Sequence, residues 1–117
     1  MATIDFTKNE DNERVDIITW SNLSGAADDE GRDYVSYLRP DKTVQVLDGF
    51  SGDTLVIEGS NDGTNYETLT DADGNALSFT GPGLKFVRES PHYLRPRIGG
   101  GTGSVTVILV AATQSRG

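Results

Sequence analysis

Side chains that could carry out catalysis or hold a metal ion are few and far apart in this sequence. The chain has one histidine, His92, and no cysteine, so a zinc site built from His and Cys ligands lacks its partners. No Gly-x-Ser-x-Gly segment offers a serine nucleophile. His92 lies between Pro91 and Tyr93, where we expect a surface turn. These features predict a protein that is not an enzyme and has no catalytic, cofactor-binding or metal-binding residues.

Many of the carboxylates stand where turns are predicted. Asp and Asn side chains stabilise turns by bonding to nearby backbone N–H groups, and Gly supplies the positive φ of a tight turn. The segment Asp71 to Asn75 is superficially similar to a calcium loop. However, Gly74 falls at position four and Pro82 at position twelve, whereas an EF-hand needs Gly at six and an acid at twelve. Turn chemistry accounts for four carboxylates: Asp48, Asp62, Asp71 and Asp73.

The charge of the chain limits its partners. The net charge is -8, which disfavours nucleic acid, because binding to phosphates depends on Lys and Arg. Residues 1–76 have a net charge of -12 and residues 77–117 one of +4, an asymmetry that suits contact between unlike surfaces, within the domain or between molecules.

The longest apolar run, 105–112, is too short to cross a membrane, and the N-terminus lacks a signal pattern. We expect a soluble protein made in a cytoplasm.

The elements that would position any site are predicted to be short strands. No segment shows a sustained helical period. Short strands at intervals of roughly 8 to 12 residues, separated by turn signals, indicate an all-β sandwich or barrel. The predicted strands are residues 15–20, 44–47, 55–58, 66–70, 76–79, 84–89, 93–98 and 105–112, with a further short strand at 34–38 inside a long loop.

Three late segments carry more specific expectations. The strand 105–112 is apolar on both faces, so its second face needs cover from a loop, the N-terminus or another subunit. Pro96 cannot donate to a sheet, which places its strand at an edge or a bulge, with Arg95 and Arg97 on one face. The glycine-rich segment 99–103 precedes a strand and not a helix, so we expect a flexible hairpin loop and not a phosphate cradle.

We divide the chain into an N-terminal arm, residues 1–14, and a β-sandwich domain, residues 15–117. The arm is polar apart from Ile4 and Phe6, and such arms often lie on a partner.

The aromatic residues leave two interpretations open. Trp20, Tyr34, Tyr37 and Tyr66 could form a platform on which sugars stack, or they could be core residues and interface anchors. We expect Trp20 in the core. Tyr34 and Tyr37 share the loop 22–42, and for them both interpretations stay open.

Three segments carry a resemblance to known proteins: I-E-G-S-N-D-G-T-N-Y-E-T-L-T-D-A-D-G-N-A-L-S-F-T (57–80), Y-L-R-P-R-I (93–98) and S-V-T-V-I-L-V (104–110). Together they resemble a group of small structural proteins of tailed phages, the head decoration or cement proteins. A second resemblance is to discoidin-like, galactose-binding jelly rolls, although Tyr66 stands where those usually have Trp. Both resemblances imply an antiparallel jelly-roll-like β-sandwich, and the matched turns look like determinants of the fold.

The first resemblance implies a virion structural protein, assembled in the host cytoplasm, that decorates the capsid exterior and clamps neighbouring major capsid protein subunits, as a homo-oligomer. The alternative is a carbohydrate-binding module of a phage tail or fibre protein, and a small hydrolase is a third. For a decoration protein, the predicted partner contacts are Ile4, Phe6, Tyr34, Tyr37, Arg88, Arg95 and Arg97.

Overall fold

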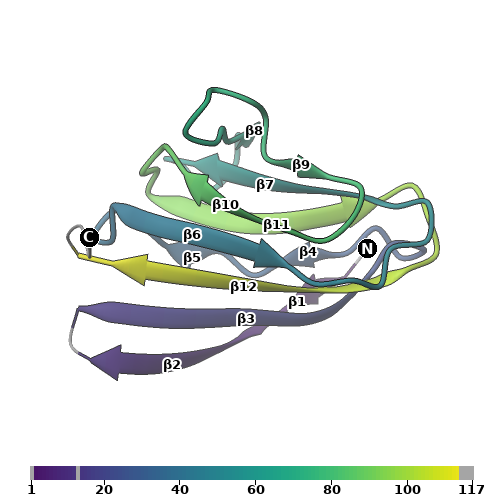
Figure 1. Ribbon diagram of the computed structural model, residues 1–117, viewed down its shortest axis with the longest axis horizontal. Helices are drawn as coiled ribbons and strands as arrows, with labels where there is room; N and C mark the ends of the chain where they lie inside the picture. The colour runs from purple at the N-terminus through teal and green to yellow at the C-terminus, as the bar shows by residue number, and fades with distance from the viewer. Residues whose placement is uncertain (1, 13, 114–117) are drawn as a thin grey trace.

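The computed structural model describes residues 2–12 and 14–113, which form two β-sheets packed face to face (Figure 1). The five-stranded sheet contains, in spatial order, β10 (Gly83–Val87), β6 (Asp41–Val46), β12 (Ser104–Ala112), β3 (Val15–Ser24) and β2 (Phe6–Asn12). The seven-stranded sheet contains β1 (Thr3–Ile4), β4 (Glu30–Gly31), β11 (Tyr93–Gly99), β7 (Thr54–Ser60) and β8 (Glu67–Thr68), with β5 (Tyr34–Val35) also paired to β11 and β9 (Ser78–Phe79) to β7.

This architecture confirms the predicted jelly-roll-like sandwich. The β1–β4 pair is parallel, and the other strand pairs are antiparallel. The described residues contain no helix, and therefore none long and apolar enough to cross a membrane.

The core lies between the two sheets and follows the alternation of the sequence. On β12, the side chains of Val105, Val107 and Leu109 are fully buried, as are those of Ile18 and Trp20 on β3. Successive side chains of a strand point to opposite faces, so each strand contributes every second residue to the core. The expectation that Trp20 is a core residue is correct.

The N-terminal residues are extended, as expected of an arm, but they belong to the sandwich. β1 pairs with β4, and β2 pairs with β3 along its length as the outermost strand of the five-stranded sheet (Figure 1). The side chain of Phe6 packs against the core. The expected boundary between residues 14 and 15 therefore separates two neighbouring strands of one sheet and not an arm from a domain.

Pro96 does not lie at a sheet edge, which corrects the prediction for its strand. β11 is an inner strand with β7 on one side and with β4 and β5 on the other. β5 pairs with residues 93 and 94, and β4 pairs with residue 97, so Pro96 lies at the break between these two short strands. A proline can occupy an inner strand at this point because no backbone partner requires its missing N–H.

The segment 99–103 is not a hairpin loop, because it carries the chain from β11 in one sheet to β12 in the other. It packs closely against residues 51–53. The carboxylate of Asp53 accepts hydrogen bonds from the N–H groups of Ser51 and Gly103, both at 2.8 Å. A Cβ atom on Gly101 would come within 2.3 Å of the carbonyl oxygen of Ser51, so this contact requires glycine.

The long loop predicted at residues 22–42 is shorter in the structure. β3 extends to Ser24, and the predicted strand at 34–38 is only the two-residue β5. Gly31 of β4 lies directly against the Trp20 and Pro96 rings, where a Cβ atom would come within 2.6 and 2.5 Å. The indole N–H of Trp20 donates to the carbonyl of Arg32 at 3.0 Å. These contacts attach the segment after β3 to the side of the core.

The predicted use of carboxylates in turns is confirmed at Asp62 and Asp71. Asp62 accepts hydrogen bonds from the N–H groups of Thr64 and Asn65 at 2.8 Å, which hold its pKa far below the usual value. Asp71 accepts from two backbone N–H groups of its own turn, those of residues 73 and 75.

Candidate functional site

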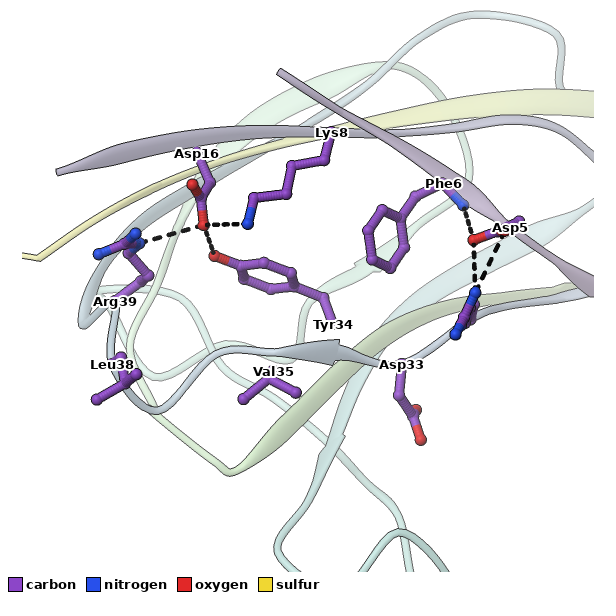
Figure 2. Close-up of a pocket in the computed structure, with 10 residues that line it drawn as sticks. Asp5, Phe6, Lys8, Asp16, Asp33, Tyr34, Val35, Leu38 and Arg39 are labelled. Carbon is purple, nitrogen blue, oxygen red and sulfur yellow. Dashed lines mark hydrogen bonds and ion pairs between the residues drawn. The ribbon is translucent and has the colours of Figure 1, made fainter. Parts of the chain in front are cut away.

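An open groove of about 610 Å³ lies where the two sheets separate at one side of the sandwich (Figure 2). β2 and the start of β3 form one wall, and β5 with the turn that follows it forms the other. Ten residues line the groove: Asp5, Phe6, Lys8, Asp16, Arg32, Asp33, Tyr34, Val35, Leu38 and Arg39.

The floor of the groove is aromatic. The Phe6 ring on β2 meets the Tyr34 ring on β5 edge to face, with the ring centroids 6.1 Å apart, and it meets Trp20 in the same manner at 5.7 Å. Edge-to-face pairs of this kind stabilise a cluster beyond the area that they bury. The groove therefore rests on the core and is not a gap between mobile surface chains.

Asp16 is a buried carboxylate at one end of the groove. Its Oδ2 atom accepts hydrogen bonds from the Tyr34 hydroxyl at 2.7 Å and from Arg39 Nε at 3.2 Å, with Lys8 Nζ at 3.8 Å (Figure 2). Burial alone would raise the pKa of Asp16, but these hydrogen bonds and positive charges outweigh it and hold the pKa below its usual value. Burial, together with the bond to Asp16, raises the pKa of Tyr34 well above its usual value.

The rim of the groove exposes apolar side chains. Leu38 is 61% exposed, and its neighbours Val35 and Tyr37 are about half exposed. The Tyr37 ring stacks on the imidazole of His92 at a centroid distance of 4.7 Å. Isolated apolar residues on a surface are ordinary, but three within four positions beside a groove make this surface a candidate for binding.

Charges at the mouth of the groove balance each other. Arg32 contacts Asp5 at 3.3 Å across the end of β1, and both side chains are largely exposed. With Lys8, Arg39, Asp16 and Asp33, the lining holds three cations and three carboxylates. The arrangement suits a ligand with an apolar side chain and a polar backbone, such as a segment of polypeptide. Among the residues that the structure describes, no group of three or more His, Asp or Glu side chains is arranged to hold a metal ion.

The structure brings together part of the predicted interface set. Phe6 and Tyr34 meet at the floor of the groove, where Tyr34 is almost fully buried. Ile4 lies on the neighbouring β1, packed against the core, and its carbonyl accepts the N–H of Arg32. Tyr37 lies near the rim. Phe6 and Tyr34 thus line the groove, whereas Ile4 and Tyr37 only adjoin lining residues in the sequence, and Tyr34 has little surface left to offer a partner.

The three predicted arginine contacts lie elsewhere. Arg95 bridges Glu30 and Glu58, with its Nε atom 2.7 Å from Glu58, and its guanidinium covers one face of the Tyr66 ring at 3.6 Å. Arg97 points to the same side of β11, as predicted, and both it and Arg88 are exposed. Arg95 is therefore occupied within the chain, whereas Arg88 and Arg97 are available to a partner.

The platform considered for sugar binding is not assembled. Trp20 is fully buried, and Arg95 covers one ring face of Tyr66. Of the four aromatic residues considered, Tyr37 alone keeps a large exposed area, and its ring stacks on His92.

Sequence reasoning missed two buried charged residues, of which Asp16 lines the groove and Lys42 does not. Asp16 and Lys42 occupy inward-facing positions on β3 and β6, where the alternation predicts apolar residues. Lys42 is fully buried and donates to the Arg39 carbonyl and the Ser90 hydroxyl, both at 3.2 Å, while burial lowers its pKa to about 8. In both cases the sequence offered a signal, namely a charged residue at a strand position where the alternation predicts an apolar one.

Comparisons with known proteins define the fold more than the function. No family model matches the chain, and a search of curated proteins returns no significant match. Among solved structures, the chain is similar to YomS, a protein derived from the SPBc2 prophage. The TM-score is 0.62 at 14% identity, covering 88% of this chain and 98% of YomS.

The matches also include cupins and an enzyme. The cupin domain of Schizosaccharomyces pombe Cnp3 gives a TM-score of 0.48 at 12% identity, over 93% of this chain and 60% of that chain. Hydroxypropylphosphonic acid epoxidase from S. wedmorenis gives 0.47 at 13% identity, over 84% and 43%.

The expectation that the chain is not an enzyme is corrected by this last comparison. An epoxidase is among the matched folds, so the fold class does not exclude catalysis. A match this distant assigns no reaction to the chain. What the comparisons show is the fold, a β-sandwich that this chain shares with a prophage-derived protein.

Proposed function

We propose that this chain is a structural protein of a phage particle, which attaches to the outside of the capsid and clamps neighbouring major capsid protein subunits. Two observations support a phage origin: the fold is similar to that of a prophage-derived protein over nearly the whole of both chains, and the turn sequences resemble those of phage decoration proteins. The geometric observation that carries the proposal is the groove with its exposed apolar rim.

A segment of the capsid protein can occupy this groove as an added strand. β2 is the last strand of its sheet, and within the described part of the chain its other side is unpaired. Edge strands bind extended peptides through backbone hydrogen bonds, while alternate side chains enter neighbouring pockets. Side chains of an added strand that point the same way as Phe6 and Lys8 would lie over the groove, against Val35 and Leu38.

Such an attachment need not be strong at each site. A protein that binds only the assembled shell stabilises that state by its binding free energy, repeated at every lattice position. A clamp that touches two subunits gains further from the second contact, which forms at a high effective concentration.

Co-sedimentation with empty capsids of the same phage tests the proposal. We expect stoichiometric decoration by the natural protein and at least a tenfold loss of affinity in Leu38→Asp, because burial of a leucine side chain contributes about 1.5–3 kcal/mol. Leu38 is 61% exposed, so the substitution leaves the fold intact. Ala26→Asp adds the same charge at an exposed position near the opposite end of β3 and should decorate normally.

Two outcomes would contradict the proposal. The first is that the natural protein sediments with capsids only at trace levels and is missing from purified particles. The second is that Leu38→Asp and the natural protein bind equally well, which would remove the groove from the contact.

A further inference from the structure

The outer face of the five-stranded sheet has no charged side chain across two complete rows of residues. The strand register defines both rows. The residues between the rows on the three central strands, Ile18, Val44 and Leu109, are buried in the core, so the side chains of the rows point outward. Half of the ten residues are apolar. One row is Thr7, Thr19, Ile108, Gln45 and Leu84, and the next is Asn9, Ile17, Val110, Thr43 and Phe86.

This uncharged face, defined by those ten residues, is open. Leu84 is 64% exposed and Phe86 is 41% exposed, while Ile108 and Val110 on the central β12 are half-buried by their neighbours. Figure 1 views the sheet from this side, and no segment crosses in front of the middle of β6, β12 and β3. We expected the second face of β12 to be covered by a loop, the N-terminus or another subunit. Within the described residues, neither a loop nor the N-terminus covers it.

The opposite face of the sandwich has a different character. On the outside of the seven-stranded sheet, Arg95 forms ion pairs with Glu30 and Glu58, and Arg97 is exposed beside them. The two outer faces thus differ: one carries charges and ion pairs, and the two rows at the middle of the other carry only neutral side chains.

We propose that the uncharged face is the surface through which two copies of this chain pack, sheet against sheet, in a two-fold dimer. Each copy has a net charge of -8, so two copies repel each other wherever charged surfaces meet. A neutral face removes this repulsion at the contact and is complementary to itself, as a two-fold interface requires. A basic partner would instead be drawn to the acidic surfaces of the chain.

The dimensions of the face set the expected affinity. Five strands at about 4.8 Å spacing give a width of about 24 Å, and the two outward-facing positions on each strand, about 7 Å apart, span roughly 13 Å including their side chains. The flat footprint is therefore ~300 Å², well below the ~800 Å² of accessible surface that each partner buries in a standard interface. We expect a weak dimer with a dissociation constant of about 100 µM, which high local concentration on a surface would favour.

Sedimentation analysis of the full chain, from about 1 to 500 µM, tests the dimer at concentrations that bracket this value. We expect the average mass to rise from monomer toward dimer with concentration. Phe86→Asp places a carboxylate in both halves of the contact and should weaken association at least 100-fold. Leu38→Asp, which changes the other exposed apolar region, should dimerise like the natural protein. Circular dichroism and urea unfolding establish that each variant is folded, and Leu84→Ser replaces Phe86→Asp if the latter is not.

A cysteine reporter gives an independent measurement, because the chain contains no cysteine. Ile108 lies on the middle strand of the sheet, so a two-fold axis through the face passes close to it. Sheets that pack face to face lie about 10 Å apart, too far for a direct disulfide, so the reporter is a short bismaleimide cross-linker. Ile108→Cys should form a covalent dimer with this reagent, whereas Ala26→Cys, outside the face, should remain a monomer.

The proposal is overturned if the natural protein is monomeric up to 500 µM, or if Ile108→Cys forms no more covalent dimer than Ala26→Cys. It is also overturned if Phe86→Asp prevents capsid decoration while the natural protein sediments as a monomer, since the face would then contact the capsid. None of these results depends on whether the groove binds the capsid.

Discussion

Removing the hydroxyl of Tyr34 tests whether the buried carboxylate of Asp16 holds the groove together. In the natural protein, this hydroxyl donates to Asp16 Oδ2 at 2.7 Å, between two strands that belong to different sheets. Tyr34→Phe keeps the ring and its contact with Phe6, so the change removes a single hydrogen bond to a charged, buried acceptor.

The expected cost follows from the charge on the acceptor. A hydrogen bond to a charged group contributes about 1.5–3 kcal/mol, roughly twice the contribution of a neutral pair. We therefore expect Tyr34→Phe to lower the free energy of unfolding by about 2 kcal/mol at pH 7. For a domain of this size, such a loss lowers the melting temperature by about 8 °C.

The pH dependence distinguishes this explanation from a simple packing defect. The folded-state pKa of Asp16 lies below its usual value, so its contribution is present at neutral pH and is lost as the pH falls through that folded-state pKa. Loss of the Tyr34 bond raises the Asp16 pKa in the folded variant. The difference in stability between the two proteins should therefore be largest near pH 7 and should shrink on acidification below about pH 4.

Urea unfolding at pH 7 and pH 3.5, followed by Trp20 fluorescence, measures this difference. Trp20 is the one tryptophan in the chain and is fully buried, so its emission reports loss of the core. Tyr37→Phe, which removes an exposed hydroxyl, is the matched control and should change stability by less than about 0.5 kcal/mol. The reasoning is refuted if Tyr34→Phe costs less than 0.5 kcal/mol or costs the same at both pH values.

Two further substitutions test the packing and the buried charge. Gly31→Ala puts a methyl group about 2.5 Å from the Pro96 ring and should destabilise the protein by about 2–3 kcal/mol, whereas Gly81→Ala, where nothing lies within 4 Å, should be neutral in the same urea assay. Lys42 has a pKa of about 8 in the folded state, below its value in the unfolded chain. As the pH rises above about 8, the folded state loses this proton before the unfolded state does, so the folded state gains stability. Relative to Lys42→Met, the natural protein should therefore gain about 2 kcal/mol between pH 7 and 9.5, and an unchanged difference would contradict the lowered pKa.

Local sequence was sufficient to predict the strands that are buried on one face or both. The strands near 15–20, 55–58 and 105–112 were found because alternating burial leaves an alternating pattern of apolar residues. The polar strand β2 was not found, since an outermost strand with one neighbour buries few side chains. The interruption of β4 and β5 beside Pro96 was equally invisible, because it depends on pairing between segments some sixty residues apart.

The groove and the uncharged face illustrate where sequence information ends. The bonds around Asp16 join β2, β3, β5 and the turn before β6, four segments whose proximity depends on how the two sheets pack. The uncharged face likewise depends on the register of five strands, and no stretch of sequence shows it by itself.

By itself, the sequence determined a cysteine-free all-β sandwich, the turn use of its carboxylates and the burial of Trp20, because these follow from periodicity and local hydrogen bonding. Only the tertiary structure decided that the N-terminus is part of a sheet, that Arg95 is held by two carboxylates and that Phe6 and Tyr34 share a groove. The physical reason is that these features are contacts between distant segments, and such contacts exist only after the sheets have paired and packed.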